Sequence, residues 1–399
     1  MDTLRFITCG SVDDGKSTLI GRLLYDTKLI LKDQLEALAT DSKKFGTQGG
    51  CLDFALLVDG LQAEREQGIT IDVAYRFFAT SKRRFIVADT PGHEQYTRNM
   101  ITGASTAHAA VLLIDARKGL LVQTKRHSRI ISMLGIRQVA LAVNKMDLVN
   151  WSKSVCDGIA DSYAHFAKDL GFDTITVIPV SALEGHNVAE AGHVAMSWYG
   201  GPSLLQWLET VKAEDGDKIK PFSMAVQWVN RPNLDFRGFS GRIASGSVRP
   251  GDSVRIIPSG VVSRIKEIVV WGGVQRTARA GQSVTLTLED EIDASRGDVI
   301  ATASHPVESA DQFEADLLWL SDHALLPGRP YSALVHTKSA TVTITHIKHR
   351  VDVNSGSFLA AKTVRLNEIA TVNLSFDRMV PFASYAENKR LGAFILIDK

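Results

Sequence analysis

The sequence predicts an α/β domain with a mostly parallel sheet, followed by two all-β barrel domains. Up to about residue 212, apolar runs alternate with segments of helical spacing, which is the order expected of strands joined by crossover helices. From Pro221 onward, short Val-, Ile- and Thr-rich runs recur between turns, and no helical segment is expected. A chain of 399 residues is also too long for a single hydrophobic core.

Changes in composition place the domain boundaries. The stretch 213–220 is rich in charged and small residues, and His305-Pro306 separates two groups of short strands. The last residues, 395–399, have the pattern of a strand that is cut short, so we expect the final barrel to be truncated. The predicted domains are 1–215, 216–305 and 306–399.

The strands of the first domain are predicted from its apolar runs. Most of these runs are nearly continuous, as expected for parallel strands covered on both faces. The second run alternates instead and leads through Ser81-Lys82-Arg83 into the third, which predicts an antiparallel hairpin at the edge of the sheet. In chain order the predicted strands are Leu4–Cys9, Ile69–Phe78, Arg84–Asp89, Ala109–Asp115, Gln138–Asn144 and Thr176–Pro179. Helical spacing falls on Leu19–Leu24, Gln123–Leu134, Val155–Leu170 and Ser203–Val211.

A glycine-rich loop, GSVDDGKST, joins the first strand to the first helix. It has the G-x-x-x-x-G-K-[ST] pattern in the strand–loop–helix setting that this phosphate-binding motif requires. Glycine allows the backbone to approach a ligand closely, and amide N–H groups at a helix N-terminus attract phosphate. Lys16 is expected to reach the β- and γ-phosphates of a nucleoside triphosphate, and Ser17 to bind Mg²⁺. The predicted phosphate-binding residues are Gly10, Ser11, Val12, Asp13, Asp14, Gly15, Lys16, Ser17, Thr18 and, from a later segment, Gly92.

Later segments are expected to complete the phosphate end of this site. Asp89 ends the third strand, so its carboxylate should lie beside the loop and hold the water shell of Mg²⁺. The Gly92 amide can contact the γ-phosphate, and His93 can orient the attacking water, although it could instead cap the next helix. Thr70 follows a charged, helix-like stretch, Gln62–Gln67, and can close over Mg²⁺ if that loop folds inward. The predicted metal ligands are Ser17, Thr70 and Asp89, and the predicted catalytic residues are His93, Lys16 and Thr70.

The base-binding end is predicted from the last two strands of the domain. Asp147 follows the fifth strand, and its carboxylate can accept hydrogen bonds from guanine N1–H and the exocyclic amine, which adenine does not offer in that arrangement. Asn144 is expected to brace the neighbouring loops, and the stem of Lys145 to lie on the base. An amide of the loop after the sixth strand should meet guanine O6. The predicted guanine-binding residues are Asn144, Lys145, Asp147, Ser181, Ala182 and Leu183.

Composition restricts the partners and the compartment. The 45 Lys and Arg residues nearly balance the 44 Asp and Glu residues, so no strong case exists for binding nucleic acid. Three scattered cysteines, with no signal peptide and no apolar run long enough to span a membrane, predict a cytoplasmic protein that does not bind a membrane. Lys82-Arg83-Arg84 is expected to form a solvated turn. The tryptophans expected in cores are Trp207, Trp228, Trp271 and Trp319.

The motifs resemble those of the translation-factor superfamily of GTPases. The stretches GSVDDGKST, EREQGIT, DTPGHEQYTRNMITGAS and NKMD carry this resemblance. Within the superfamily, the sequence resembles the large, GTPase subunits of bacterial sulfate adenylyltransferases over essentially the whole chain. The resemblance to this particular family within the superfamily rests on three stretches: DGLQAEREQGITIDVAYRFF, VQWVNRPNLDFRGFSGRIASGSVRPGD and LEDEIDASRGDVI. Elongation factor Tu and its relatives usually carry His where this chain has Ser11 and Asp14, and Arg where it has Gln67.

The resemblance implies an elongation-factor-like architecture, with an α/β P-loop GTPase domain followed by two all-β barrel domains. It implies GTP and Mg²⁺ as ligands. It also implies a partner, the small catalytic subunit of sulfate adenylyltransferase, which makes adenosine 5′-phosphosulfate and pyrophosphate from ATP and sulfate. Hydrolysis of GTP by this chain is expected to drive that reaction in a heterodimer or a higher assembly. Family members normally continue past the last strand, some into an adenylylsulfate kinase domain.

Two alternatives remain open at this point. One is an elongation-factor-like GTPase that delivers aminoacyl-tRNA to ribosomes, and the other is a regulatory GTPase whose barrels only bind another protein. The same nucleotide site would serve all of these functions. The balanced charge and the departure of Asn230–Asn233 from the second domain of elongation factor Tu weigh against the first alternative.

Overall fold

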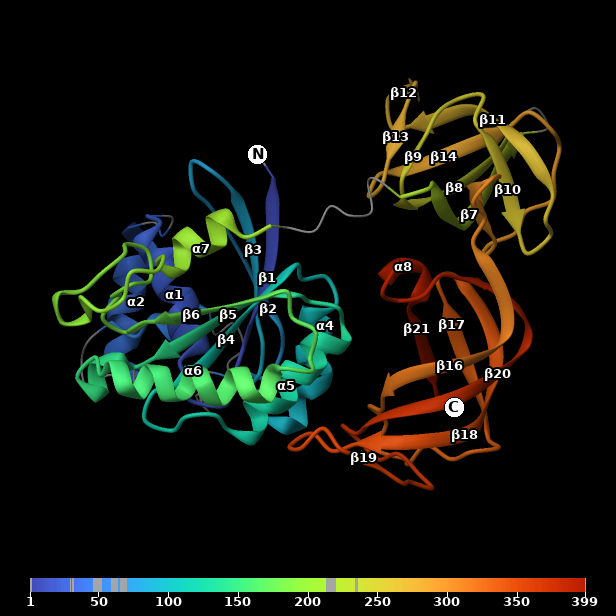
Figure 1. Cartoon of the computed structure of the whole chain (residues 1–399). Helices are drawn as coiled ribbons and strands as arrows, with labels where there is room; N and C mark the ends of the chain where they lie inside the picture. Colours follow the sequence, from blue (N-terminus) through green and yellow to red (C-terminus); the bar gives the residue numbers. More distant parts are fainter. Residues whose placement is uncertain are drawn as a thin grey trace. The chain divides into compact units, whose positions relative to one another are not determined.

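The computed structural model describes residues 2–28, 30, 32–45, 52–58, 64, 70–212, 220–233 and 236–398. The chain divides into two compact units, Met1–Ala213 with Val353–Ser355 and Glu214–Asp352 with Gly356–Lys399. The first unit is α/β and the second is rich in β-strands (Figure 1). The predicted fold class is therefore confirmed.

A six-stranded sheet forms the centre of the first unit as far as its residues are described, with strand order β2-β3-β1-β4-β5-β6. Neighbouring strands pair in parallel except for β2, which runs antiparallel to β3 at the edge of the sheet. The predicted edge hairpin is thus confirmed. The strands are β1 (Thr3–Cys9), β2 (Ala74–Ala79), β3 (Arg84–Asp89), β4 (Ala109–Asp115), β5 (Gln138–Asn144) and β6 (Thr174–Pro179).

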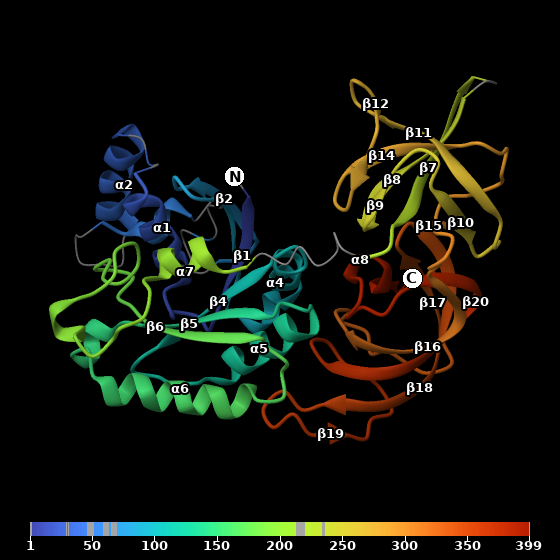
Figure 2. The same ribbon diagram turned by 45° about the horizontal axis from the view of Figure 1, so that its top comes forward.

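Helices cover both faces of this sheet (Figures 1 and 2). Leu19 and Leu23 of α1 and Leu208 of α7 pack in one core with strand residues such as Val111, while α4, α5 and α6 pack against the opposite face. All seven residues of β4 are buried as a result. The helices are α1 (Lys16–Asp26), α2 (Lys32–Phe45), α4 (Thr97–Ala104), α5 (Val122–Met133), α6 (Lys153–Ala167) and α7 (Leu204–Thr210). Short 3-10 helices are η1 (Phe54–Leu57), η2 (Glu94–Tyr96), η3 (Met146–Val149) and η4 (Val194–Met196).

Strand β2 begins later than the sequence predicts. The expected strand was Ile69–Phe78, but pairing with β3 starts only at Ala74, and Ile69 lies outside the described residues. The Glu64 carboxylate accepts a hydrogen bond of 2.9 Å from the Ile71 amide, and the side chain of Asn99 donates to the Ile71 carbonyl over 2.8 Å. Side chains therefore satisfy backbone groups that a strand would present to a neighbour. Apart from Glu64, the predicted helix-like stretch before this segment also lies outside the described residues.

Among the described residues, the second unit contains two large hydrophobic cores and a smaller cluster in which Leu391 packs with residues of the first group of strands, such as Ile257 and Val299. Around the first core, the strands follow the order β10-β15-β7-β8-β14-β11-β12, and β10 also pairs with β11, which closes a barrel. Around the second core the order is β16-β20-β18-β17-β21. The strands of the first group are β7 (Ser223–Asn233), β8 (Phe236–Ser245), β9 (Ser247–Val248), β10 (Ser253–Ile257), β11 (Val262–Val270), β12 (Gly273–Gln275), β13 (Ala278–Arg279), β14 (Ser283–Leu288) and β15 (Val299–Thr302). Those of the second are β16 (Glu308–Leu318), β17 (Pro330–Val335), β18 (Lys338–Val351), β19 (Phe358–Leu359), β20 (Ile369–Phe382) and β21 (Phe394–Ile397).

The expectation that no helix follows Pro221 is wrong at one place. A single turn, α8 (Lys389–Gly392), begins after Asn388, whose side chain accepts hydrogen bonds from the amides of Arg390 and Leu391. Four residues are too few to leave a helical period in the sequence. Over the described part of the chain, no helix combines the length and the apolar character that a membrane-spanning segment needs.

Two of the four tryptophans expected in cores are exposed. Trp207 and Trp319 are buried, whereas Trp228 is 62% exposed and Trp271 is fully exposed. Trp271 lies in the turn between β11 and β12. A bulge in β7 between Val226 and Trp228 breaks the inward–outward alternation, so that Trp228 faces outward. A period-2 pattern cannot reveal such an extra residue.

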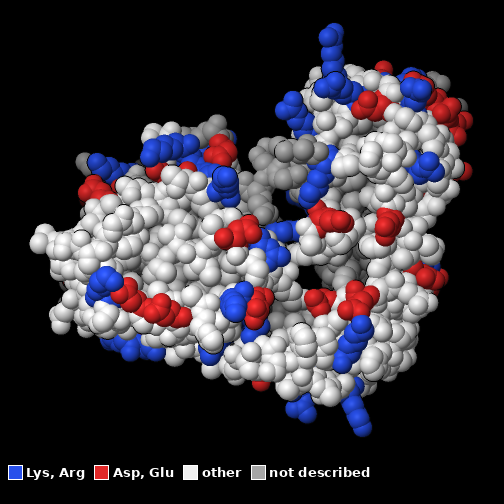
Figure 3. Space-filling model, in the orientation of Figure 1, with Lys and Arg blue, Asp and Glu red and all other residues white. Residues whose placement is uncertain are grey.

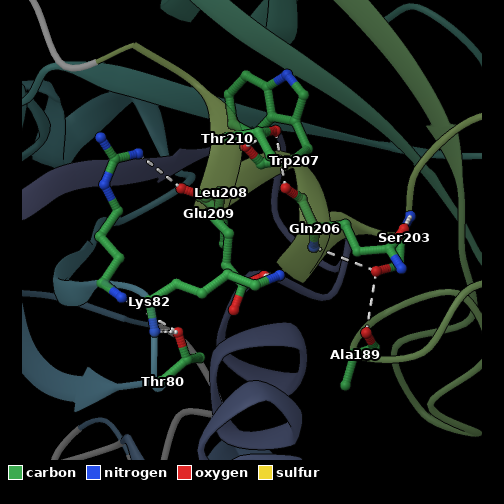
Figure 4. Close-up of polar contacts among 10 residues, drawn as sticks. Thr80, Lys82, Ala189, Ser203, Gln206, Trp207, Leu208, Glu209 and Thr210 are labelled. Atoms are coloured by element: carbon green, nitrogen blue, oxygen red, sulfur yellow. Dashed lines mark hydrogen bonds and ion pairs between the residues drawn. The ribbon is translucent and has the colours of Figure 1, made fainter.

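The turn between β2 and β3 is anchored to α7 and is only partly solvated. Arg83 was expected to be exposed, but it is 6% exposed and donates to the carbonyls of Leu208 (3.0 Å) and Val211 (2.6 Å) at the end of α7. The ammonium of Lys82 lies 2.7 Å from the carboxylate of Glu209, as Figure 4 shows from the side of the helix. The hairpin that leads into β3 is therefore held against the last helix of the first unit.

Replacing Arg83 by Ala should destabilise the chain by about 2 kcal/mol, because it leaves two buried carbonyls without their donor. The measurement is the shift in melting temperature of the purified chain. Arg84→Ala is the matched control, since the side chain of Arg84 is exposed and its loss should cost less than about 0.5 kcal/mol. Equal shifts for the two variants would contradict the anchoring role of Arg83.

Candidate nucleotide-binding site

The glycine-rich loop follows β1 and ends in the first turn of α1, as the sequence predicts. Gly10 has φ 147° and Gly15 has φ 92°, which are backbone angles that favour glycine. A Cβ atom on Gly10 would lie 2.7 Å from the carbonyl oxygen of Leu113, and one on Gly15 would lie 2.5 Å from Nδ2 of Asn144. Only glycine fits at these two positions, so the loop can lie directly on the ends of β4 and β5.

Side chains from the end of β5 hold the middle of the loop. Nδ2 of Asn144 donates to the carbonyl of Asp14 over 2.7 Å, and Nζ of Lys145 donates to the carbonyl of Asp13 over 2.5 Å. Oδ1 of Asn144 also accepts from the amide of Ala182 over 2.9 Å. Asn144 therefore connects the glycine-rich loop to the loop that follows β6.

Lys16 lies inside the curve of the loop. Its Nζ donates to the carbonyl of Ser11 over 2.7 Å. Burial lowers the pKa of this ammonium, and the carboxylates of Asp89 and Asp14 oppose that shift. Gly92 also comes close to the loop, because a Cβ atom there would lie 2.6 Å from Nζ of Lys16. The structure therefore brings together the predicted lysine, the loop and Gly92.

The three predicted metal ligands converge. Oγ of Ser17 donates to Oδ2 of Asp89 over 2.6 Å and lies 3.2 Å from Oγ1 of Thr70. Asp89 is fully buried, and its other oxygen accepts from the hydroxyl of Thr8 over 3.1 Å. Burial raises the pKa of Asp89, while the hydrogen bond from Ser17 acts in the opposite direction. Two hydroxyls and a carboxylate are the hard oxygen ligands that suit Mg²⁺, so this donor set fits the metal.

The remaining predicted phosphate-binding residues lie along the loop itself. Asp14 is buried and its Oδ2 accepts from the Ser11 amide over 2.6 Å, while burial raises the pKa of this carboxyl. Asp13 is exposed and has φ 68°. Val12 and Thr18 are half-buried.

The predicted guanine-binding residues lie in two neighbouring loops. Asp147 is half-buried in η3, the short helix that begins after Lys145. Ser181 and Ala182 follow the end of β6 and are buried. Leu183 is exposed, and its carbonyl accepts from Nη1 of Arg22 in α1 over 3.3 Å.

His93 is placed differently from the metal ligands. It is exposed, and its Nδ1 accepts from the Gln95 amide over 3.2 Å at the start of η2. This is the local capping role that the sequence left open as the alternative. Among the described residues, no hydrogen bond joins His93 to the glycine-rich loop.

Sequence reasoning missed two buried groups next to the loop. His127 of α5 accepts a hydrogen bond from the Gly10 amide at Nδ1 over 3.2 Å, and burial, with help from Lys16, lowers the pKa of its imidazole to about 3. Asp115 ends β4 and pairs with Nζ of Lys145 at 3.0 Å. The end of an apolar run could have indicated Asp115, as it did Asp89, but a histidine inside a helical pattern carries no such signal.

Comparison with known proteins identifies the family. Residues 1–215 match the family model "Elongation factor Tu GTP binding domain", and residues 312–399 match "GTP-eEF1A C-terminal domain-like". Sulfate adenylyltransferase subunit 1 of Methylorubrum extorquens is 55% identical over 398 residues, which are 100% of this chain and 85% of that protein. The chain belongs to the sulfate adenylyltransferase subunit 1 family. Its first domain is accordingly a GTP-binding domain, and GTP is its nucleotide.

Other members of the family extend well beyond this chain. The subunit 1 of Saccharophagus degradans is 52% identical over 398 residues, with 100% of this chain and 84% of that protein covered. The "Bifunctional enzyme NodQ" of Rhizobium sp. (strain N33) is 58% identical over 396 residues, but these are 99% of this chain and only 61% of that protein. The chain thus spans about three fifths of the length of this bifunctional relative.

Replacing Asp147 by Asn should weaken GTP binding about 100-fold or more while changing the weak affinity for ATP little, because the amide presents an N–H donor to the exocyclic amine of guanine, which is itself a donor. Competition against a fluorescent GDP analogue measures both affinities. The carboxamide should instead favour xanthine, which carries a carbonyl in place of the exocyclic amine. A similar loss of GTP and ATP binding would contradict the assignment of Asp147 to the base.

Proposed function

We propose that this chain is the GTP-hydrolysing subunit of a sulfate adenylyltransferase. GTP hydrolysis at its nucleotide site drives a partner small subunit to form adenosine 5′-phosphosulfate and pyrophosphate from ATP and sulfate. The observation that carries this proposal is a sequence identity of 52 to 55% to subunit 1 proteins over 398 residues, which are 100% of this chain. The convergence of Ser17, Thr70 and Asp89 beside the glycine-rich loop supports the hydrolytic part of the proposal.

The loop and Lys16 bind the phosphates of GTP. The amides at the start of α1 present partial positive charge, and the Lys16 ammonium exchanges neutral carbonyl oxygens for charged phosphate oxygens. Gly92 lies close enough to Lys16 for its amide to contact the γ-phosphate. Water then attacks the γ-phosphate in line with the leaving oxygen, and the fixed charges of the site stabilise the charge that develops.

Ser17, Thr70 and Asp89 are the residues that hold Mg²⁺ in this proposal. The ion supplies positive charge next to the β- and γ-phosphates when it is bound. The contribution of the chain is to hold the hydroxyls of Ser17 and Thr70 next to the buried carboxylate of Asp89, so that oxygen atoms of all three side chains lie close together.

His93 orients the attacking water in this proposal. Its imidazole is exposed and adjacent to Gly92, and its Nδ1 already has a local partner in the Gln95 amide. That partner holds the ring in one orientation and requires an unprotonated Nδ1, so Nε2 is the atom available to water. Docking of the partner subunit brings His93 into its working position.

The partner is a small catalytic subunit, bound as a heterodimer or in a higher assembly, and nucleic acid is not among the proposed partners. Relatives carry the name subunit 1, which supports a second subunit. Figure 3 shows Lys and Arg side chains interspersed with Asp and Glu over the drawn face of the described residues, a pattern that does not favour nucleic acid. We propose a cytoplasmic location, which the buried free thiols of Cys9 and Cys156 support.

We also propose that the chain consists of three domains, 1–215, 216–305 and 306–399. The two large cores of the second unit, one on each side of residue 305, support the second boundary. The match of the elongation factor model to residues 1–215 supports the first.

Replacing His93 by Ala should lower the rate of GTP hydrolysis at least about 100-fold while GTP still binds. Single-turnover hydrolysis and the dissociation constant of GTP are the two measurements. His93→Asn is the matched control, since Asn caps a helix as well as any residue but has no imidazole. If His93 acts only as a cap, the Asn variant will hydrolyse GTP at the normal rate, and the catalytic assignment fails.

Adding a sulfate adenylyltransferase small subunit, ATP and sulfate should raise GTP turnover by this chain, and adenosine 5′-phosphosulfate should accumulate in step with GDP. Slow turnover is expected for the chain alone, since His93 reaches its working position only when the partner docks. Lys16→Ala should abolish both signals. If the small subunit, ATP and sulfate leave the rate of GTP hydrolysis unchanged, the proposed function is wrong. Binding of aminoacyl-tRNA would then be measured.

A further inference from the structure

The first two amides of the glycine-rich loop donate to side chains. The Gly10 N–H donates to Nδ1 of His127 over 3.2 Å, and the Ser11 N–H donates to Oδ2 of Asp14 over 2.6 Å. His127 comes from α5, 117 residues further along the chain, and both acceptor side chains are buried. These two N–H groups are therefore committed to acceptors within the protein.

We propose that His127 and Asp14 form a pair of acceptors that fixes the first turn of the glycine-rich loop and so positions its later amides for phosphate. His127 is a positioning residue in this inference, because it acts through the Gly10 backbone. The inference rests on the proposed function in one respect, that this loop binds the phosphates of GTP.

The surroundings of His127 keep its imidazole neutral. Burial is the main cause of its low pKa, and the positive charges of Lys16 and Arg126 add to it. A neutral ring has one acceptor nitrogen and one donor nitrogen, whereas an imidazolium has two donors and could not accept from Gly10. With Nδ1 accepting, Nε2 carries the proton. Nε2 of Gln123 lies 3.2 Å from this nitrogen and is itself a donor, so the hydrogen bond from Gly10, and not Gln123, sets the tautomer.

The geometry of Gly10 explains why an acceptor is needed there. At Gly10, directly after β1, φ is 147°, and the carbonyl oxygen of Leu113 would lie 2.7 Å from a Cβ atom. The N–H of Gly10 then points into the buried space beneath the loop, where water is excluded. A buried N–H without an acceptor costs free energy, so the turn is stable only if α5 supplies one.

Asp14 has the same role for the amide of Ser11, which lies only three residues before it in the chain. Its Oδ2 accepts from Ser11, while its Oδ1 is buried without a hydrogen-bond partner among the described residues.

The test compares two substitutions of His127. His127→Leu fills the buried space but offers no acceptor, and should weaken binding of a fluorescent GDP analogue about tenfold. His127→Asn places an oxygen near the position of Nδ1, and should bind within about threefold of the unchanged chain. Discrimination between GTP and ATP should be the same in both variants, because the guanine end of the site is not touched.

Ser128→Ala is the matched control for stability. Ser128 is the next residue of α5 and is equally buried, but its hydroxyl bonds to the carbonyl of Thr124 and to Tyr163, away from the loop. This variant should lower the melting temperature without changing GDP affinity. The inference is wrong if His127→Leu binds GDP normally. It is also wrong if the loss of GDP affinity in His127→Leu, His127→Asn and Ser128→Ala simply follows the decrease in melting temperature of each variant.

Hydrogen exchange of the Gly10 amide tests the inference without any nucleotide. The amide should be protected in the unchanged chain and in His127→Asn, and should exchange at least about tenfold faster in His127→Leu. Equal protection in both variants would overturn the inference. A chain that binds no guanine nucleotide but shows this exchange pattern would refute the proposed function and leave the role of His127 at Gly10 in place.

Replacement of Asp14 tests the second acceptor. Asp14→Asn keeps an oxygen for the Ser11 amide and should keep GDP affinity within about threefold, whereas Asp14→Ala should lose about tenfold. If the Ala variant binds GDP as well as the Asn variant, Asp14 has no positioning role.

Discussion

The buried carboxylate of Asp89 is the constraint on which the nucleotide site depends. A carboxylate out of contact with water is tolerated only when hydrogen bonds replace its hydration. Asp89 obtains them from Thr8 at the end of β1 and from Ser17 in the first turn of α1. The register that places Thr8 opposite Asp89, the end of β3 and the start of α1 are thereby fixed together. The glycine-rich loop lies between two of these fixed points, so its ends have little freedom.

The sequence could predict this arrangement because its main determinants are local. Strands β3, β4 and β5 begin and end at the predicted residues, since parallel strands covered on both faces must be apolar throughout. Asp89 and Asn144 each end such a run, and parallel strands present their carboxyl ends at one edge of the sheet. Their proximity to the loop therefore followed from topology alone, before any distance was known.

The features that escaped prediction depend on contacts between distant segments. Nothing in the pattern of α5 distinguishes His127 from a solvated polar residue, and nothing near Arg83 shows that the end of α7 needs a donor for its carbonyls. Glu64 likewise ends the pairing of β2 from outside the strand. In each case a side chain satisfies a buried backbone group, and the need for it exists only once the fold has formed. Outward-facing Trp228 has another cause, a bulge that shifts the alternation of β7.

The contacts around Lys16 suggest why the loop needs so many fixed points. Lys16 donates to two carbonyls of its own loop, Gly10 and Ser11, which are the residues whose amides are held by His127 and Asp14. The ammonium is therefore already desolvated and oriented, so phosphate oxygens replace carbonyls without a further cost of burial. Replacement of these carbonyls by phosphate oxygens favours nucleotide binding only if the carbonyls stay in place. If the loop could move with Lys16, its carbonyls would compete with phosphate for the ammonium. In the proposed phosphate site, rigidity at Gly10 and Ser11 thus makes the lysine available, so the acceptors beneath the loop would support phosphate binding together with its amides.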